Sequence, residues 1–381
     1  MNATPGRISL LAAAVLISLL PLRPRMAWAA APEDAPRDCV RLFDARSFRE
    51  AQECFAARVA QQPADAVALF DLGRTYYERR QPVPAIDGLR RAVARAPGRS
   101  DFHDWLGRAY GIAAQRASVV RQFGLAAKAR QEFERAVELD PANPDALEDL
   151  IEFQIQAPAF LGGSLAKAKA HAAELERQDP LRGRLARAAI LLHQPAGPAR
   201  PAGPARPGRT PGPAGSVGSA GSGPAGSAGP AGSAGSEGPA GLVGAAAAER
   251  ELRAAAADFP ADPRPRLALA AAYEQAGRLE QAGDEIEAAL RLDPDNAAAS
   301  AALARVAAAS GRRLERAAEL LTRELQRLPP GDDAALADGH YALGAVLERQ
   351  GDRRRAREHY QEALRRDPGS VEVRAALRRL P

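Results

Sequence analysis

Several residue types are scarce in this chain, and each scarcity argues against a class of fold or of partner. Aromatic residues make up only 5% of its 381 residues, while hydrophobic residues together reach 46%. Apolar burial must therefore come mostly from alanine and leucine, which suits thin helix–helix packing better than one thick globular core. Lysine occurs only three times, so nearly all positive charge is arginine, intermixed with Asp and Glu. A nucleic-acid binder normally segregates its basic charge, so we expect no nucleic-acid partner.

Catalytic and cofactor motifs are also missing. No lysine follows a glycine, so there is no phosphate-binding loop, and Gly162-Gly163 does not extend to a dinucleotide fingerprint. The histidines show no metal-ligand spacing: His103, His171, His193, His340 and His359. The serine–glycine pairs lie in a low-complexity tract, not at a strand-to-helix elbow. We therefore expect a protein that is not an enzyme and holds no metal or cofactor. An enzyme with a site across inserted loops is kept as the third alternative.

The amino terminus has the pattern of an export signal over residues 1–29. Arg7 precedes an apolar run from Ile8 to Leu20, and Ala27-Trp28-Ala29 supplies a small-x-small cleavage site. A run of about 13 residues is short for a membrane span of about 20. Because the chain is also rich in Arg and Ala, we expect an exported bacterial protein in the periplasm, without a stable membrane span after cleavage. An uncleaved anchor in the inner membrane is the alternative.

The only two cysteines are Cys39 and Cys54. They lie in consecutive predicted helices at equal distances from a turn near Arg46-Ser47, so an antiparallel hairpin would place them level. We expect a disulfide in an oxidising compartment. Closing a loop of about 15 residues would stabilise the fold by roughly 3 kcal/mol. Two separate buried thiols are the alternative, whereas the spacing is not the C-x-x-C of a redox-active pair.

A spacing of about 34 residues organises most of the chain. One copy of the pattern consists of Leu72-Gly73, Tyr76, Ala85, Leu89, Ala92 and Pro97, and it returns over Leu269–Pro294 and Leu343–Pro368. Small residues stand where two helices approach, large apolar residues follow helical spacing, and a proline ends each copy. Such a helix–turn–helix unit must stack on a neighbour. The pattern resembles the tetratricopeptide repeat, which implies an all-α, right-handed superhelical solenoid of about eight repeats.

The repeat register predicts how the chain is divided. After the signal, we expect an amino-terminal array over residues 32–194, an insertion over 195–244, a carboxy-terminal array over 245–370 and a capping helix over 371–381. The Pro/Gly/Ala/Ser tract separates Arg184–His193 from Ala248–Asp258, which fit as the two helices of the fifth repeat. We interpret it as a disordered insertion at that turn. An interdomain linker is the alternative, and would leave two half-repeats with exposed apolar faces.

Repeats three and four carry insertions as well. About ten extra residues lengthen repeat three around Ile112–Lys128. Repeat four holds a loop motif made of Gln156, Ala157, Pro158, Gly162 and Gly163, whose proline and glycines require a bent loop. This motif looks like that of a group of exported bacterial tetratricopeptide proteins. All three insertions fall at the turn within a repeat, so they elaborate one rim in the middle of the array.

The resemblance implies a concave groove lined by the first helix of each repeat. The residues expected to face it are Phe70, Arg74, Tyr77, Asp101, Asp104, Arg108, Asp145, Glu148 and Glu152. Their aromatic rings and acidic stretch would suit a peptide or partner helix with basic side chains. Solvated helix faces are the alternative for these positions. The carboxylate clamp of chaperone-binding members is absent, because its positions carry Phe70, Arg74 and Trp105.

We therefore expect a scaffold or adaptor that mediates protein–protein interaction in the bacterial cell envelope, with a protein or peptide as partner. The alternative function is a constitutive structural subunit of an envelope complex.

Overall fold

The computed structural model describes residues 37–194 and 241–380. Within these ranges it contains seventeen α-helices and one 3-10 helix, and no strand. The first helices of the eight hairpins are α1 (Arg37–Asp44), α3 (Ala66–Glu78), α5 (Ser100–Arg116), α7 (Pro144–Gln156), α9 (Pro180–Leu192), α11 (Arg264–Gln275), α13 (Ala297–Ser310) and α15 (Asp333–Gln350). The second helices are α2 (Phe48–Gln61), α4 (Pro82–Arg95), α6 (Val119–Leu139), α8 (Leu165–Gln178), α10 (Gly241–Asp258), α12 (Leu279–Leu292), α14 (Leu314–Arg327) and α16 (Arg353–Arg366). The 3-10 helix η2 (Ala159–Leu161) precedes α8, and α17 (Val371–Arg379) ends the array.

Aspartate and asparagine side chains start many of the first helices. Asp65 accepts the backbone N–H groups of Val67 and Ala68, each at 3.0 Å, at the start of α3. Asn143, Asp179 and Asn296 cap α7, α9 and α13 in the same way. Each cap satisfies N–H groups that have no partner within the helix, which fixes where the new repeat begins.

Glycine allows the two helices of a hairpin to touch. A Cβ atom added at Gly73 would lie 2.7 Å from the Leu89 side chain, and one at Gly107 would lie 2.6 Å from the Phe133 ring. The same position in the last hairpin is Gly344, where an added Cβ would lie 2.7 Å from the Tyr360 ring. The repeating Leu-Gly pair of the sequence thus marks where a large side chain of the second helix crosses the first.

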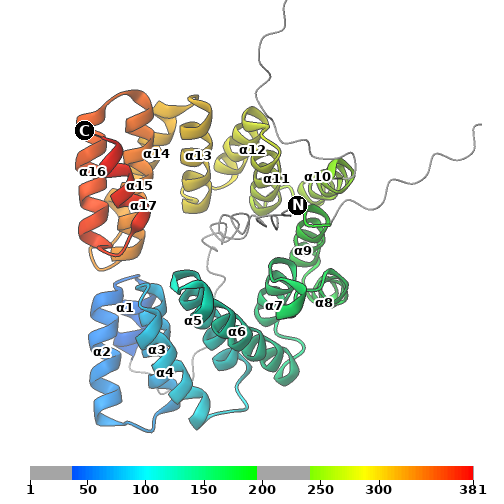
Figure 1. Ribbon diagram of the computed structural model, residues 1–381, viewed down its shortest axis with the longest axis vertical. Coiled ribbons are helices and arrows are strands. Elements are labelled where there is room, and N and C mark those ends of the chain that lie inside the picture. Colours follow the sequence, from blue (N-terminus) through cyan, green and yellow to red (C-terminus); the bar gives the residue numbers. More distant parts are fainter. Residues whose placement is uncertain (1–36, 195–240, 381) are drawn as a thin grey trace, which may run out of the picture.

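The hairpins stack into a curved array, with the first helices along the inner side (Figure 1). Successive first helices contact one another: α3 with α5, α5 with α7, α7 with α9, α9 with α11, and α13 with α15. Helices packed on the inside of a curve come closest, so the array presents these first helices on its concave face. The expected all-α superhelical solenoid of about eight hairpins is confirmed.

The array continues across the segment between α9 and α10. These two helices pack against each other, with Ala188 and Leu252 buried in one apolar cluster. Arg187 bridges them by binding Glu251 at 2.6 Å, and Arg184 pairs with Asp258. Residues 195–240 lie outside the described part. Helix α10 begins at Gly241, inside the range expected for the insertion, and a Cβ at Gly244 would lie 2.7 Å from the Leu191 carbonyl oxygen.

The two ends of the array meet along a polar contact that we call the seam. On one side it consists of Arg46, Arg49, Arg79 and Arg80, and on the other of Asp332, Asp333 and Asp338. Arg46 binds Asp332 at 2.6 Å and Arg49 binds Asp333 at 3.1 Å. The turns within the first two hairpins therefore contact the start of α15 (Figure 1).

Both backbone and covalent constraints hold the first hairpin. A disulfide joins Cys39 of α1 to Cys54 of α2, with Cα atoms 5.5 Å apart. Arg46, in the turn between these helices, has φ of 60°, and Arg80 has φ of 55°. These left-handed conformations end the first helix of each hairpin and aim both arginines at the seam.

The expected export signal, residues 1–29, falls outside the described residues. Among the helices of residues 37–194 and 241–380, none is both long enough and apolar enough to cross a bilayer.

Candidate functional site: the concave face of the first five hairpins

All nine residues expected in the groove lie on first helices. Phe70, Arg74 and Tyr77 belong to α3, the next three to α5, and the last three to α7. Phe70 is buried and stacks on Phe102 with ring centroids 4.3 Å apart. Trp105 meets Phe70 and Tyr77 edge-on, at 6.4 and 5.2 Å. Helical spacing thus gathers the rings of α3 and α5 into one aromatic cluster.

The arginine of α3 lies over this cluster. The Arg74 guanidinium carbon is 4.4 Å from the centroid of Phe43, 5.2 Å from Phe70 and 5.0 Å from Trp105. Its Nη1 also donates to Asp71 at 3.3 Å. Burial raises the pKa of Asp71 to about 6, because the nearby charge of Arg74 only partly offsets the loss of hydration. The second carboxylate oxygen of Asp71 is buried without a hydrogen-bond partner in the described structure.

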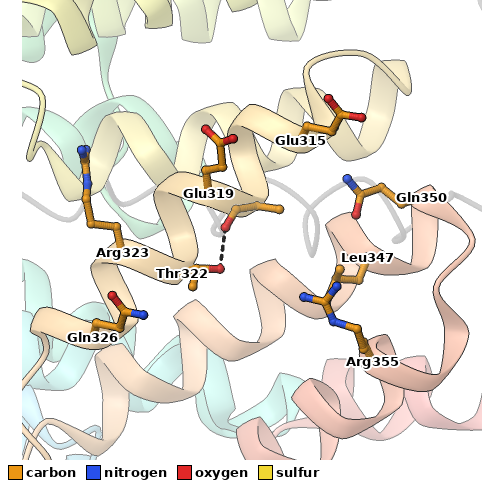
Figure 2. A pocket seen from close by; sticks show the side chains of 9 residues that line it. Glu315, Glu319, Thr322, Arg323, Gln326, Leu347, Gln350 and Arg355 are labelled. Carbon is orange, nitrogen blue, oxygen red and sulfur yellow. Dashed lines mark hydrogen bonds between the residues drawn. The ribbon is translucent and has the colours of Figure 1, made fainter.

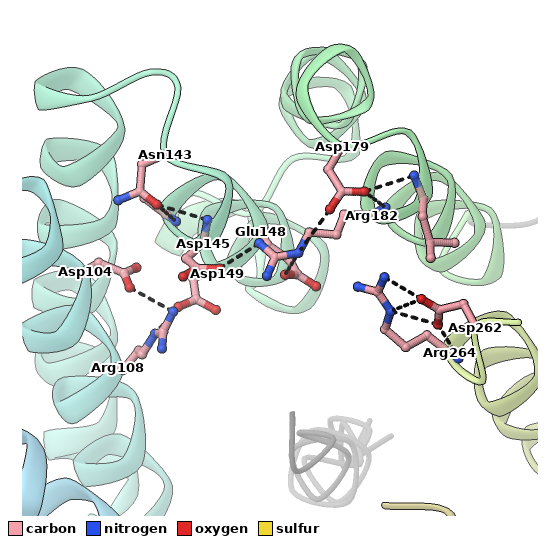
Figure 3. Close-up of polar contacts among 12 residues, drawn as sticks. Asp104, Arg108, Asn143, Asp145, Glu148, Asp149, Asp179, Arg182, Asp262 and Arg264 are labelled. Carbon is pink, nitrogen blue, oxygen red and sulfur yellow. Dashed lines mark hydrogen bonds and ion pairs between the residues drawn. The ribbon is translucent and has the colours of Figure 1, made fainter. Parts of the chain in front are cut away.

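A second arginine is held between two carboxylates. Arg108 binds Asp104 at 2.9 Å within α5, and it pairs with Asp149 of α7 (Figure 3). Burial raises the pKa of Asp104 well above its usual range. Burial would lower the pKa of Arg108, but Asp104 and Asp149 reverse the effect and raise it. The arginine therefore stays charged and ties two neighbouring repeats together.

A third arginine, Arg182 of α9, faces the acids of α7. It binds Asp145 at 2.7 Å and lies 3.8 Å from Glu148 and 3.6 Å from Asp179 (Figure 3). On the next hairpin, Arg264 pairs with Asp262 at 2.7 Å and lies opposite this group in Figure 3. Sequence reasoning named neither Arg182 nor Arg264. The available signal was their position, two or three residues after a capping aspartate.

The concave face is therefore a series of ion pairs and not an open acidic stripe. Besides the pairs above, Asp101 binds Arg99 at 2.7 Å, and Glu152 accepts a 3.0 Å hydrogen bond from the Gln156 amide. Arg184 and Arg187 of α9 pair with Asp258, Glu251 and Glu176 of the second helices. Arginines thus lie against most of the acids of α5 and α7, which favours a partner recognised by specific pairing over one attracted by net charge alone.

The loop motif of repeat four forms a tight structure next to this face. Gly163 donates its N–H to the Pro158 carbonyl at 3.1 Å, and Ser164 donates to the Gln154 carbonyl at 2.8 Å. A Cβ at Gly163 would lie 1.6 Å from the Ala157 oxygen, so only glycine fits there. Gly162 has φ of 99° and ends η2.

A hollow elsewhere does not resemble a catalytic site. It has a volume of about 490 Å³ and lies between α14, α15 and α16, lined by polar side chains such as Glu315, Thr322 and Arg355 (Figure 2). Nearby, His340 and His359 bring their Nδ1 atoms to 2.9 Å, a pair that the sequence did not reveal. No group of three metal-ligating side chains occurs in the part of the chain that the structure describes.

Comparison with known proteins gives the same architecture. Three stretches match family models described as tetratricopeptide repeat: residues 41–110, 245–306 and 337–370. The comparison with curated proteins found no match. Among solved structures, yeast Tom70 is 13% identical with a TM-score of 0.56, covering 97% of this chain and 68% of Tom70.

Two bacterial structures are also similar. A thermophilic tetratricopeptide-repeat protein of Thermus thermophilus is 17% identical, with 71% of this chain and 95% of that chain covered and a TM-score of 0.40. A tetratricopeptide-repeat protein of Parabacteroides merdae is 13% identical, with coverages of 90% and 95% and a TM-score of 0.44. Family members are in general non-enzymatic scaffolds for protein–protein interaction. The stacked hairpins and the three matched stretches together support membership of the tetratricopeptide-repeat family.

Proposed function

We propose that the protein is an exported scaffold of the bacterial cell envelope that binds a peptide or partner helix on its concave face. One observation carries this proposal: aromatic rings and paired charges line the first helices from α3 to α9. Buried ion pairs contribute little net stability, and apolar packing would serve the fold as well. A face built from Arg74, Arg108 and Arg182 with their carboxylates is therefore better explained by recognition than by folding.

The paired charges of the face also indicate how a partner would be chosen. A ligand that places cations near Asp145, Glu148 and Glu152 shares carboxylates already oriented by Arg182 and Gln156. Aromatic residues such as Tyr77 and Trp105 supply apolar area beside them. Carboxylates that are already held in place lose little side-chain entropy on binding. Specificity would then come from how well the spacing of the ligand's cations matches the spacing of these carboxylates along the groove.

The experiment compares two double charge reversals with the same spacing. Glu148→Lys with Glu152→Lys changes α7 of the groove, and Glu315→Lys with Glu319→Lys changes α14 outside it. The full chain is used as bait in an envelope extract, and captured proteins are identified by mass spectrometry. We expect the α7 variant to lose partners that the wild type and the α14 variant retain. Equal capture by all three proteins, with unchanged helical circular dichroism, would reject the groove as the binding site.

Export is a separate part of the proposal. It is supported by the signal pattern of residues 1–29 and by the disulfide between Cys39 and Cys54, which is typical of oxidising compartments. Amino-terminal sequencing of protein from the periplasmic fraction should begin at Ala30. Protein found only in the cytoplasm with Met1 retained would reject export, while a Met1 terminus in the membrane fraction would indicate the uncleaved anchor.

A further inference from the structure

The rim beside the groove carries a cluster of exposed apolar side chains, which we call the rim patch: Val119, Val120, Phe123 and Phe160. Their exposed fractions are 61%, 85%, 40% and 74%. The first three begin α6 and the last lies in η2, so the patch joins the insertions of repeats three and four. The Phe123 and Phe160 rings meet edge-on, with centroids 5.7 Å apart. The other large hydrophobic side chains exposed in the described residues, Val83, Leu292 and Val371, stand on three different helices.

The exposure of the patch is built into the fold. The loop that carries Phe160 is closed by the Gly163 and Ser164 hydrogen bonds, and it admits no side chain at Gly163. A Cβ at Gly162 would lie 2.5 Å from the Arg130 side chain, so this loop packs directly on α6. A tight loop that holds a phenylalanine outward at the cost of apolar hydration indicates a surface that is covered by something else.

The two sequence segments that carry the patch hold charge of one sign. Residues 116–130 and 156–171 contain no Asp or Glu, although acidic residues number 47 in the chain. They do contain six cations, including all three lysines of the protein: Arg116, Arg121, Lys128, Arg130, Lys167 and Lys169. All of them except Arg130 are exposed. The nearest carboxylate before η2, Glu152, accepts the Gln156 amide, and Glu132 of α6 binds His103 at 2.6 Å.

We propose that the rim patch docks on the surface of a lipid bilayer with anionic headgroups. Valine and phenylalanine side chains would enter the boundary between headgroups and acyl chains, while the lysines and arginines bind lipid phosphates. Long basic side chains suit this arrangement because their stems accompany the apolar tip and their charges stay in the headgroup layer. The structure holds the apolar and the basic side chains at two adjoining turns of one rim.

A bilayer fits the patch better than an acidic peptide does. Val120 and Phe160 project from turns and are among the most exposed apolar side chains described. A peptide partner normally places its own apolar residues into a groove, whereas a membrane receives residues that protrude. The patch uses none of the groove residues of α3, α5 and α7. Docking would therefore leave the groove available, and the two proposals can fail separately.

The experiment places a fluorophore on the patch of the full-length protein. Val120→Cys is labelled with an environment-sensitive nitrobenzoxadiazole, since Cys39 and Cys54 are joined and leave the new thiol as the reactive one. Val371→Cys, a valine on α17 that is 66% exposed, is the matched control position. Each protein is titrated with phosphatidylcholine vesicles, with or without phosphatidylglycerol, and with brominated lipid as a quencher. This local readout is independent of the apolar run near the amino terminus, which all variants share.

We expect a blue shift and bromine quenching at position 120 with phosphatidylglycerol vesicles, and neither change at position 371. Replacing Lys128, Lys167 and Lys169 by Gln should weaken the vesicle affinity reported at position 120 at least tenfold, since each removed charge weakens attraction to the anionic surface. Replacing Arg354, Arg365 and Arg378 by Gln removes the same charge elsewhere and should change it less than twofold.

Two results would overturn the proposal. The first is a fluorescence signal at position 120 that does not change with either kind of vesicle, or that changes equally with neutral and anionic lipid. The second is a response to a synthetic acidic amphipathic peptide without any response to vesicles, which would assign the rim patch to a protein partner instead.

Discussion

Two helix contacts in this molecule differ in kind: one within the fifth hairpin and one between the two ends of the array. Where α9 meets α10, Ala188 and Leu252 are almost completely buried, and ion pairs such as Arg187–Glu251 lie at the margin. Where the first two hairpins meet the start of α15, the contact consists of Arg46, Arg49, Arg79 and Arg80 against aspartates. The first contact withdraws apolar surface from water, and the second orients charges that water can solvate again.

This difference indicates where the molecule can open. Separating α9 from α10 would expose Ala188 and Leu252, which belong to a continuous apolar cluster that extends to Leu380. Separating the seam would expose mostly charged side chains, whose hydration returns much of the lost energy. We infer that the stack behaves as one unit and that the seam sets how closed the groove is.

Truncating a side chain of the stack should have the largest effect. Leu252 of α10 is 1% exposed, so Leu252→Ala would leave a cavity and lose about 3 kcal/mol of stability. Thermal unfolding followed by circular dichroism should show a clearly lower Tm. Val371→Ala, at an exposed position, is the control and should change stability by less than about 0.5 kcal/mol. Equal effects of both variants would mean that α10 does not belong to the stack.

Removing the disulfide should have the second largest effect on stability. Cys39→Ser with Cys54→Ser frees the first hairpin, which has one stacked neighbour and carries Arg46 and Arg49. Releasing a loop of about 15 residues should cost roughly 3 kcal/mol, mostly as early melting of this hairpin. Mass spectrometry of the unreduced wild type should show one peptide pair joined with the loss of two hydrogens. Two thiols that alkylate freely without reduction would contradict the linkage.

Sequence reasoning found the stack but not the seam. The Leu-Gly pairs, the spacing of apolar residues and the proline that ends each copy are local signals, so the hairpins and their order follow from them. The seam joins residues more than 250 positions apart, such as Arg80 and Asp338, and depends on how small rotations between hairpins accumulate. No local pattern encodes that sum.

The candidate site could likewise be predicted only in part, because contacts between repeats are not encoded by a local pattern. The register places Phe70, Asp104 and Glu148 on first helices, and the structure brings those helices together. The pattern could not show that Arg108 also reaches Asp149 or that Arg182 reaches Asp145, because these two pairs join neighbouring repeats. An acidic stretch read along the sequence thus becomes a series of ion pairs in space.

The carboxyl of Glu324, which feels the charge of Arg46 in the seam, should make the stability of the protein depend on pH. Burial raises the pKa of Glu324 to about 7 from 4.5, although Arg46 partly opposes this, and one of its oxygens is buried without a hydrogen-bond partner. Because the folded state prefers the neutral form, this group destabilises it increasingly from pH 4.5 to 7 and fully above that. Glu324→Gln should therefore stabilise the protein by about 2 kcal/mol at pH 8 and have no effect at pH 4. The measurement is Tm across this pH range, with exposed Glu319→Gln as the control that should leave the profile unchanged.

The smallest effect should come from a single ion pair of the seam, and it distinguishes the seam from the stack most directly. The Asp332 carboxylate is 1% exposed but Arg46 is 38% exposed, so we expect a coupling of about 1 kcal/mol between Arg46→Gln and Asp332→Asn in a double-mutant cycle. Because the pair is partly solvated, added salt should weaken the coupling, whereas the effect of Leu252→Ala should not depend on salt. Closure can be read separately with Ser47→Cys and Gly331→Cys, since a Cβ at Gly331 would lie 3.4 Å from the Ser47 Cα. This pair should crosslink within one chain at low salt and more slowly at high salt, and Ser47→Cys with Gly351→Cys should not crosslink. A coupling near zero together with salt-independent crosslinking would mean that the seam is held by shape and backbone contact, so that the array closes without its charges.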